Sequence, residues 1–315
     1  MNSDSILITG SSGFVGSKLY SILKTNYKKI TCLDKVESKN LSFNIDLGEK
    51  KNISEIKDII KDNNINVVVH LAALRNDYQD DIKEYLKDNV DATKILLQAL
   101  DSLNIEYFLH VSSVAELDGK TIYPNKKLKY DDAYRYTKYL QSKLIQEFCI
   151  KKGIELCVLC PSAIFDENLR TDTNIGRLQT ITKFVNIFPE IHTKKSLTYL
   201  ENFCNFIENC IRNKTTGKFV CIEQPILSVS DIIRHLSYPS RIIFFRVPFL
   251  KYFLLLLAII LFPLKYLNFD PQLTLNRVVK LFRDTTYENI GSEINGINYS
   301  KYNDSKDLIE VLNKI

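Results

Sequence analysis

The chain has 315 residues and a mass of 36.4 kDa, which is enough for one large α/β domain or two ordinary domains and too long for a disulfide-held miniprotein. Hydrophobic residues make up 45% and charged residues 25%. These values are close to globular averages and argue against long disorder and against a multi-span membrane protein. The net charge of +5 is spread along the chain, so we expect no nucleic-acid partner.

The first predicted elements are a strand, a glycine turn and a helix. Residues 5–9 form a short apolar run, residues 18–23 have helical spacing, and Gly10, Gly13 and Gly16 lie between them. Such a turn lets backbone N–H groups approach a diphosphate, and the helix N-terminus adds partial positive charge. The G-x-x-G-x-x-G spacing therefore predicts a dinucleotide site, with an ordinary strand-to-helix turn as the alternative.

The next predicted strand, residues 31–34, ends in an acid. Asp34 follows Gly16 by about 18 residues, where a carboxylate can accept hydrogen bonds from the adenosine ribose. We expect NAD as the cofactor because this carboxylate would repel a 2′-phosphate, while the adjacent Lys35 keeps NADP open as the alternative. A solvated turn residue is the other interpretation of Asp34.

Further alternation predicts the fold class. Residues 65–71 and 107–112 are apolar strand candidates, and residues 89–100 have helical spacing. Strands that alternate with helices are typical of a mainly parallel sheet. We therefore expect an α/β protein with a doubly wound, Rossmann-type NAD(P)-binding domain over residues 1–165. A small C-terminal substrate-binding lobe over residues 166–315 would be interleaved with it.

A tyrosine and a lysine four residues apart form the candidate catalytic pair. On a helix, Tyr134 and Lys138 would share one face, and the ammonium would favour the phenolate over its usual pKa of about 10. Such a pair can act as a general base that takes a hydroxyl proton while hydride leaves carbon. An exposed i,i+4 pair is the alternative, and Tyr136 is a rival phenol.

The seven cysteines predict a reducing, cytoplasmic setting. Their number is odd, and residues 1–9 are too polar and too short for a secretory signal. Cys157 and Cys160 have C-x-x-C spacing inside an apolar run, but residues three apart on a strand face opposite ways. Since no second pair or nearby histidine completes a zinc site, we expect structural cysteines and no metal.

Several separated segments resemble one family, the extended short-chain dehydrogenase/reductases, and within it the NAD-dependent epimerase/dehydratase group that acts on nucleotide sugars. In chain order these segments are 9–16, Asp46-Leu47, 70–73, Asn89-Val90, Ser112-Ser113, the Y-x-x-x-K of 134–138, 161–165 and 196–202. Together they cover about residues 5–202.

The resemblance implies a role for each matched residue. Ser113, Tyr134 and Lys138 would be catalytic, and Ser113, Asn174 and Arg177 would contact the substrate. The implied cofactor contacts are Gly10, Gly13, Phe14, Val15, Gly16, Asp34, Asp46, Leu47, Leu71, Ala72, Ala73, Asn89, Ser112, Tyr134, Lys138, Pro161 and Ile164.

The choice of Ser113 rests on alignment from the strand. The stretch from Ser113 to Gly119 is one residue longer than the family's usual pattern, and loops absorb insertions more readily than strands do. Alignment from Gly119 would instead place Val114 at the catalytic position. Ser112 is then expected to be a structural or cofactor-side hydroxyl.

The function implied by the resemblance is that of a UDP-hexose or UDP-N-acetylhexosamine 4-epimerase that works with NAD through a 4-keto intermediate in surface polysaccharide synthesis. An NAD(P)H-dependent 4-ketosugar-nucleotide reductase is the first alternative, and a non-catalytic NAD-binding regulator is the second. Val114-Ala115 stands where dehydratases of the family carry an acid pair, although Glu116 is near. A homodimer through the Tyr134 helix is implied by the resemblance alone.

Phosphate-binding candidates in the second half compete with simpler interpretations. Asn174 and Arg177 resemble the helix start that binds the sugar-nucleotide diphosphate, but a helix N-cap explains Asn174 equally well. Lys195, Arg241 and Arg277 are further candidates, each weighed against a solvated surface charge.

Residues 253–264 (FLLLLAIILFPL) are the most apolar stretch of the chain. They are too few to span a bilayer, which needs about 20 residues. We expect a buried helix of the substrate lobe. The alternative is peripheral membrane contact through residues 247–267, with a helix in the membrane interface that is anchored by Lys251, Lys265 and Tyr266 and gives access to lipid-linked sugars.

Overall fold

The computed structural model describes residues 2–74, 82–119, 130–168, 174–237, 242–261, 275–287, 299 and 307–314. The chain divides into two compact units, each built from three segments. The first unit comprises Met1–Ser162, Leu200–Ile222 and Asn289–Ser305, and the second comprises Ala163–Tyr199, Glu223–Glu288 and Lys306–Ile315.

The first unit is built on a seven-stranded sheet in which every pair of neighbouring strands is parallel. In spatial order the strands are β11 (Gly217–Cys221), β6 (Glu155–Pro161), β5 (Tyr107–Val111), β4 (Val67–His70), β1 (Asn2–Thr9), β2 (Tyr27–Asp34) and β3 (Phe43–Asn44). The order reverses between β1 and β4, which is the switch point of a doubly wound sheet. The predicted fold class is confirmed.

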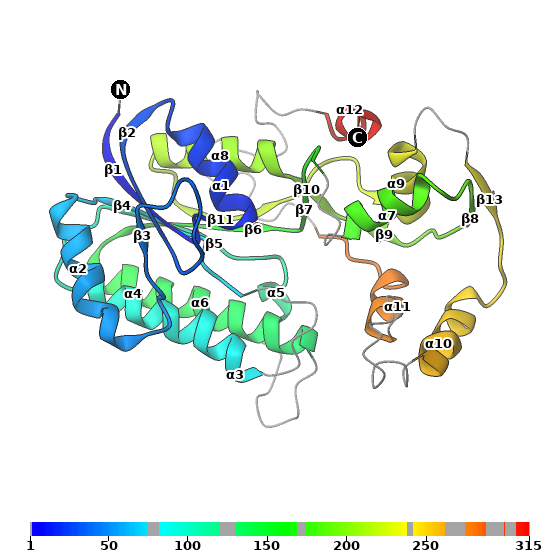
Figure 1. Ribbon diagram of the computed structural model, residues 1–315, viewed down its shortest axis with the longest axis horizontal. Helices are drawn as coiled ribbons and strands as arrows, with labels where there is room; N and C mark the ends of the chain where they lie inside the picture. Colours follow the sequence, from blue (N-terminus) through cyan, green and yellow to red (C-terminus); the bar gives the residue numbers. More distant parts are fainter. Residues whose placement is uncertain are drawn as a thin grey trace. The chain divides into compact units, whose positions relative to one another are not determined.

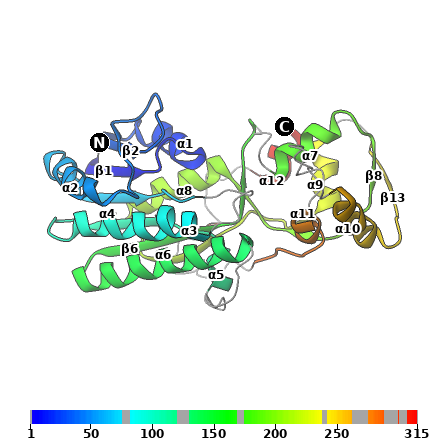
Figure 2. The same cartoon turned by 60° about the horizontal axis from the view of Figure 1, so that its bottom comes forward.

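Helices cover both faces of this sheet (Figures 1 and 2). The helices α1 (Phe14–Leu23) and α8 (Leu200–Arg212) pack together on one face. On the other face lie α2 (Ile53–Asp62), α4 (Ala92–Leu100) and α6 (Tyr130–Lys152). Because both faces are covered, the central strands are near-continuous apolar runs, and all residues of β4 and β5 are buried.

Short elements connect these helices and strands. They are η1 (Lys50–Asn52), α3 (Ile82–Tyr85), the π-helix η2 (Leu86–Asp91) and α5 (Glu116–Gly119). The π-helix runs directly into α4, and its Asn89 and Val90 are buried. Asn89, one of the predicted cofactor contacts, therefore lies in a π-helical turn, a feature that is frequent at functional sites.

The second unit has small sheets and five helices among its described residues. Its strand pairs are β7 (Ala163–Phe165) with β10 (Leu197–Tyr199), β9 (Lys194–Lys195) with β12 (Leu227–Ser228), and β8 (Ile187–Pro189) with β13 (Ile243–Phe245). The helices are α7 (Asn174–Thr182), α9 (Val229–Leu236), α10 (Leu250–Leu261), α11 (Leu275–Leu281) and α12 (Leu308–Lys314). A capping box between Ser228 and Asp231 begins α9, and the buried face of α9 contributes to the core of this unit.

The expectation of a buried apolar helix is wrong for α10. Of its twelve residues only Ala258 is buried, whereas Tyr252, Phe253, Leu256, Ile259 and Ile260 are exposed. One side of the helix packs on α11 and on the small cluster around Phe188, and the opposite side is exposed because the described part of this unit provides no second layer there. Within the described residues, no helix is both long enough and apolar enough to cross a bilayer.

Candidate active site

The glycine turn after β1 is a tight backbone crossing. Gly10 has a φ of +73°, a conformation that side-chain-bearing residues rarely adopt. A Cβ on Gly10 would lie 2.7 Å from the backbone nitrogen of Ala72, and one on Gly16 would lie 2.3 Å from the carbonyl oxygen of Gly10. Glycine is therefore required where the turn meets the chain after β4 and where α1 packs against the turn.

The start of α1 faces this turn without a side-chain cap. Gly13 is the N-cap residue, exposed and extended in backbone, and no side chain accepts a hydrogen bond there. Phe14 and Val15 form the first helical turn and are half-buried. An uncapped helix start next to a glycine turn is suited to an anionic group because backbone N–H groups and the helix dipole point toward it.

Asp34 lies beside the turn at the end of β2. Its carboxylate accepts hydrogen bonds from the backbone N–H of Ser12 at 2.9 Å and of Val36 at 3.0 Å. Asp46 lies just beyond β3 and accepts from the Gly48 N–H at 2.8 Å. The structure thus brings Asp34 to the glycine turn.

The neighbouring cofactor candidates have different surroundings. Leu47 is buried in the main core. The residues after β4 come next to the turn, where the Leu71 N–H donates to the Thr9 carbonyl at 3.1 Å and Ala73 is exposed. Asn89 is fully buried and bonds the Leu74 N–H at 2.6 Å and the Thr137 hydroxyl at 3.1 Å. Through these hydrogen bonds Asn89 links the loop after β4 to α6.

The two predicted serines lie just after β5 and have separate environments. The Ser112 hydroxyl is buried and donates to the Glu116 carboxylate, which also accepts from the Ser142 hydroxyl of α6. The Ser113 hydroxyl is half-buried and accepts from the Ala115 N–H at 3.2 Å. Ser112 therefore faces the protein interior, and Ser113 is the serine with exposed surface.

Glu116 is the buried carboxylate of an ion pair whose lysine is about half exposed. Its carboxylate is almost fully buried and pairs with the ammonium of Lys218 on β11. With Ser112 and Ser142 also bonded to it, this carboxylate holds the loop after β5 against α6 and β11. These contacts give Glu116 a structural position behind the loop, which weighs against its use as a dehydratase acid.

The predicted catalytic pair lies in the first half of α6. The Tyr134 ring is half-buried and packs edge-on against Tyr85, with ring centroids 6.4 Å apart. Lys138 is buried, and its Nζ donates to the carbonyl of Val111 at 3.0 Å and to Oε1 of Gln141 at 2.6 Å. Burial lowers the pKa of the Lys138 ammonium to about 8, against the opposing attraction of Glu116.

A buried hydrogen-bond network continues from Lys138 under the carboxyl edge of the sheet. Gln141 Nε2 donates to His70 Nε2 at 3.0 Å and to the Thr93 hydroxyl at 2.9 Å. Because His70 Nε2 accepts, its Nδ1 carries the proton and donates to the Thr9 hydroxyl at 2.7 Å. Burial, and then the charge of Lys138, lowers the pKa of His70 to about 3, so the ring is neutral.

Sequence reasoning missed Gln141 and the partners of His70 as parts of this site. Gln141 lies three residues after Lys138 and seven after Tyr134, a spacing that places all three on one helix face. This spacing is the sequence feature from which Gln141 could have been predicted as a neighbour of Lys138. The polar residues at the ends of β1 and β4 meet only because these strands are neighbours in the sheet, and such adjacency is set by topology.

Apart from Asn89, Tyr134 and Lys138, which lie on helices, the first-unit candidates follow the carboxyl ends of neighbouring parallel strands. The glycine turn follows β1, Asp34 ends β2, Ala72 follows β4, Ser113 follows β5 and Pro161 ends β6. The Pro161 carbonyl accepts from the Val114 N–H at 3.0 Å and so ties the β6 end to the serine loop. This edge is where open α/β sheets bind ligands.

The remaining candidates belong to the second unit. Ile164 is half-buried on β7, and Arg177 is half-buried on α7. The side chains of Asn174 and Arg277, and the whole of Arg241, lie outside the described residues. The Nζ of Lys195 donates to the carbonyls of Lys280 at 2.7 Å and Arg283 at 2.6 Å, which joins β9 to the end of α11.

The cysteines are all buried and free, as predicted. Cys157 and Cys160 lie on β6, between β11 and β5 in the sheet. Among the described residues no group of three or more histidine, cysteine, aspartate and glutamate side chains gathers closely enough to hold a metal ion.

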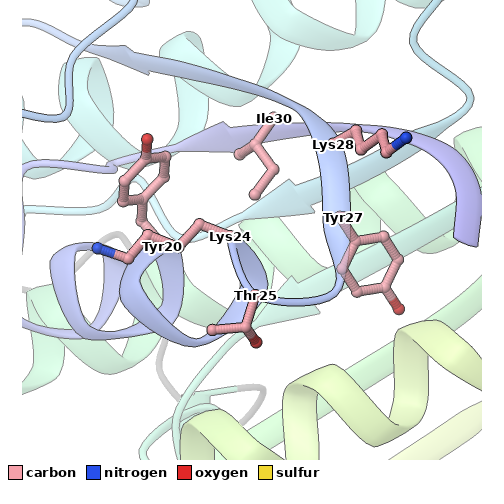
Figure 3. A pocket seen from close by; sticks show the side chains of 6 residues that line it. All are labelled: Tyr20, Lys24, Thr25, Tyr27, Lys28 and Ile30. Carbon is pink, nitrogen blue, oxygen red and sulfur yellow. The ribbon is translucent and has the colours of Figure 1, made fainter. Parts of the chain in front are cut away.

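A hollow of about 260 Å³ lies at the other end of β2 (Figure 3). Tyr27 begins β2 and lines the hollow, whereas Asp34 ends the same strand. The hollow is therefore at the amino end of the strand, away from the carboxyl edge that carries the candidate residues. Its lining residues are Tyr20, Lys24, Thr25, Tyr27, Lys28 and Ile30.

Known proteins resemble this chain in sequence and in fold. The sequence model described as "NAD dependent epimerase/dehydratase family" matches residues 6–202. An Escherichia coli O157:H7 relative named N-acetyl-alpha-D-glucosaminyl-diphospho-ditrans,octacis-undecaprenol 4-epimerase is 24% identical over 237 residues, which cover 73% of this chain and 70% of the relative.

Two solved structures have a similar fold. UDP-N-acetylglucosamine 4-epimerase from Bacillus cereus superimposes with a TM-score of 0.64 at 19% identity, over 78% of this chain and 86% of that one. UDP-glucuronic acid 4-epimerase from Bacillus cereus, solved in complex with NAD, gives a TM-score of 0.61 at 19% identity over the same shares.

Proposed function

Because the chain belongs to the NAD dependent epimerase/dehydratase family of enzymes, we propose that it is a 4-epimerase of UDP-hexoses or UDP-N-acetylhexosamines that uses bound NAD. One observation carries the proposal: the glycine turn and the Ser113 loop follow strands of the same carboxyl edge, and the Lys138 ammonium donates to the last carbonyl of β5. The names of the E. coli relative and of the two Bacillus cereus structures, all 4-epimerases, support the reaction type.

The residues at the turn fit NAD. The crossing at Gly10 has no room for a side chain, and the start of α1 has no side-chain cap, so backbone N–H groups can approach a diphosphate. Asp34 stands at the end of β2, where it would accept hydrogen bonds from the adenosine ribose. When bound, NAD supplies reversible hydride exchange with C4 of the sugar.

In the proposed mechanism this chain moves the proton and orients the sugar. Tyr134 accepts the proton of the C4 hydroxyl and later returns it, and Ser113 donates a hydrogen bond to the same oxygen. Lys138 keeps a positive charge close to the phenol on the same helix face, which favours the phenolate. The network through Gln141 and His70 fixes the direction of the Lys138 ammonium.

The second unit is proposed to be the substrate-binding lobe. Arg177 and the start of α7 would bind the sugar-nucleotide diphosphate, since a guanidinium forms charge-assisted bonds to phosphate. Ile164 and Pro161 would pack on the nicotinamide.

Two further parts of the proposal concern assembly and location. A homodimer formed through α6 would sediment at twice the monomer mass in analytical ultracentrifugation. The seven free, buried thiols suit the reducing cytoplasm.

NMR of the purified protein with UDP-N-acetylglucosamine tests the function. Formation of the C4 epimer without added cofactor supports the proposal. Stoichiometric oxidation of NADPH with a 4-keto sugar nucleotide, and no epimer, would instead identify a reductase. Bound NAD without turnover of any UDP-sugar would indicate a regulator.

A lipid-linked sugar is the second candidate substrate. The name of the E. coli relative specifies N-acetylglucosamine joined through a diphosphate to undecaprenol. Because the C4 chemistry is the same, the NMR experiment should include this lipid-linked sugar in detergent micelles. Turnover of it alone would move the proposal from UDP-sugars to lipid-linked ones.

A further inference from the structure

The helix α10 presents an apolar face to the surroundings. Five of its side chains are exposed: Tyr252, Phe253, Leu256, Ile259 and Ile260. At about 100° per residue these positions fall within an arc of roughly 120°. Ala258, the one buried residue of the helix, lies on the opposite side. The exposed residues thus form one continuous stripe, and the protein covers the reverse side.

The chain just before α10 also exposes large apolar side chains. Phe249, immediately before the helix, is 79% exposed. On β13, Ile243 and Phe245 alternate with the half-buried Phe244, and both are exposed. The preceding strand and turn therefore also expose large apolar side chains.

The same stretch of sequence carries only positive charge. Between Asp231 and Asp270 the chain contains no aspartate or glutamate, although Lys and Arg recur, at 234, 241, 246, 251 and 265. Of these, Arg246 and Lys251 flank Phe249 and are exposed. Arg246 pairs with Glu190 at 3.0 Å and Arg234 with Asp231 at 2.7 Å, so the charge that matters for α10 is that of Lys251. An apolar stripe within a stretch of chain that carries lysine and arginine but no acid is complementary to a surface that combines hydrocarbon with negative charge.

We propose that the exposed face of α10 rests flat in the interface of a membrane that contains anionic lipids. Twelve residues make a helix roughly 18 Å long, too short for a hydrocarbon core of about 30 Å. A helix that is apolar all round needs apolar cover on all sides. The protein covers the side that holds Ala258, and acyl chains cover the stripe. The proposal does not depend on the proposed function, because it uses only burial, charge and helix length.

Charge and composition favour a lipid surface over a protein partner. A second copy of this chain would bring the same acid-free, cationic segment against itself, and like charges oppose that contact. Aromatic residues at the start of the stripe, namely Phe249, Tyr252 and Phe253, are of the kind that sit at the level of lipid headgroups.

A single tryptophan reports on this contact directly. The chain contains no tryptophan, so Leu256→Trp provides the only indole. We expect its emission to shift to shorter wavelength on addition of vesicles of phosphatidylcholine with 30% phosphatidylglycerol, and lipids brominated on the acyl chains should quench it. Ile150→Trp, at a 73% exposed position of α6 in the other unit, is the control, and its emission should stay unchanged.

Vesicle flotation with the unlabelled protein supplies the second measurement. The double variant Phe253→Ser with Leu256→Ser should lower the partition coefficient about tenfold or more, because two large apolar side chains no longer enter the acyl region. Ile150→Ser should leave it unchanged. Lys251→Glu should weaken binding to the anionic vesicles severalfold, and added salt should weaken the wild type in the same direction.

Three results would overturn the proposal. The first is wild-type protein that stays in the bottom fraction and does not float with the vesicles at low salt. The second is binding that the double variant does not reduce. The third is a concentration-dependent dimer that the double variant dissociates while vesicles remain unbound, since the face would then join two copies of this chain. Catalytic turnover plays no part in these readouts, so their failure leaves the proposed epimerase untouched.

Discussion

Burial of Lys138 predicts that the stability of the protein rises in mildly alkaline solution. The pKa of this ammonium falls from its ordinary value of 10.5 to about 8, chiefly because of burial. The difference of about 2.5 corresponds to about 3 kcal/mol, since each unit is about 1.4 kcal/mol. That free energy is the cost of keeping the amine charged inside the first unit.

The sign follows from which state holds the proton. Below about pH 8 the amine is charged in both the folded and the unfolded chain, so the full cost of burial is present. Between about pH 8 and 10.5 the folded chain has released the proton while the unfolded chain still holds it. The free energy of unfolding therefore increases with pH in this window, by at most about 1.4 kcal/mol per pH unit from this group.

Urea unfolding of the wild type and of Lys138→Met from pH 7 to 10.5 measures the effect. The free energy of unfolding of the wild type relative to the variant should rise by about 3 kcal/mol across the window. Lys143→Met removes an exposed lysine from the same helix and serves as the control. Parallel pH profiles for the wild type and Lys138→Met, or a wild type that weakens relative to the variant, would refute the reasoning.

Three further predictions test other parts of the site. Tyr134→Phe should lower the rate of epimer formation by about 10²- to 10⁴-fold through loss of the acid–base group, with Tyr136→Phe near wild type; equal losses in both variants would contradict the assignment. Gly10→Ala should weaken NAD binding at least about tenfold in calorimetry, because the added Cβ lies 2.7 Å from the Ala72 nitrogen; wild-type affinity would show that the turn does not hold the cofactor. Lys218→Met should lower the free energy of unfolding by about 1–3 kcal/mol, since the buried Glu116 carboxylate loses its cation; unchanged stability in urea would contradict that account.

The sheet could be predicted from sequence because its strands carry a strong local signal. The runs 65–71 and 107–112 are mostly apolar, as is typical of strands covered on both faces. The glycine turn was equally visible, since a residue at positive φ against a neighbouring backbone is limited to glycine. Both signals depend only on the residues themselves and on their immediate neighbours along the chain.

The polar network could not be predicted because its members come from four elements. Thr9, His70, Thr93 and Gln141 meet only after β1, β4, α4 and α6 have packed together. Each residue alone is unremarkable in a strand or helix. The orientation of the Lys138 side chain likewise depends on a hydrogen bond to the carbonyl of Val111 on β5. The helical spacing of α6 does not predict where that carbonyl lies.

The apolar run at α10 shows the limit of composition. Its sequence indicates a helix that avoids water, and burial in the substrate lobe was the expected outcome. Whether such a helix is covered depends on how many layers the surrounding unit provides. Here one side packs on α11 and the Phe188 cluster, while the stripe from Tyr252 to Ile260 is exposed.

Turnover of a UDP-sugar deuterated at C4, in ordinary water and in the presence of NAD, tests the central claim most directly. If hydride leaves C4 and returns to it while Tyr134 handles only the hydroxyl proton, the epimer keeps its deuterium at C4, and a parallel reaction of unlabelled sugar in ²H₂O gains none there. Loss of the label to solvent, or no epimer from any UDP-hexose or UDP-N-acetylhexosamine, would contradict the account.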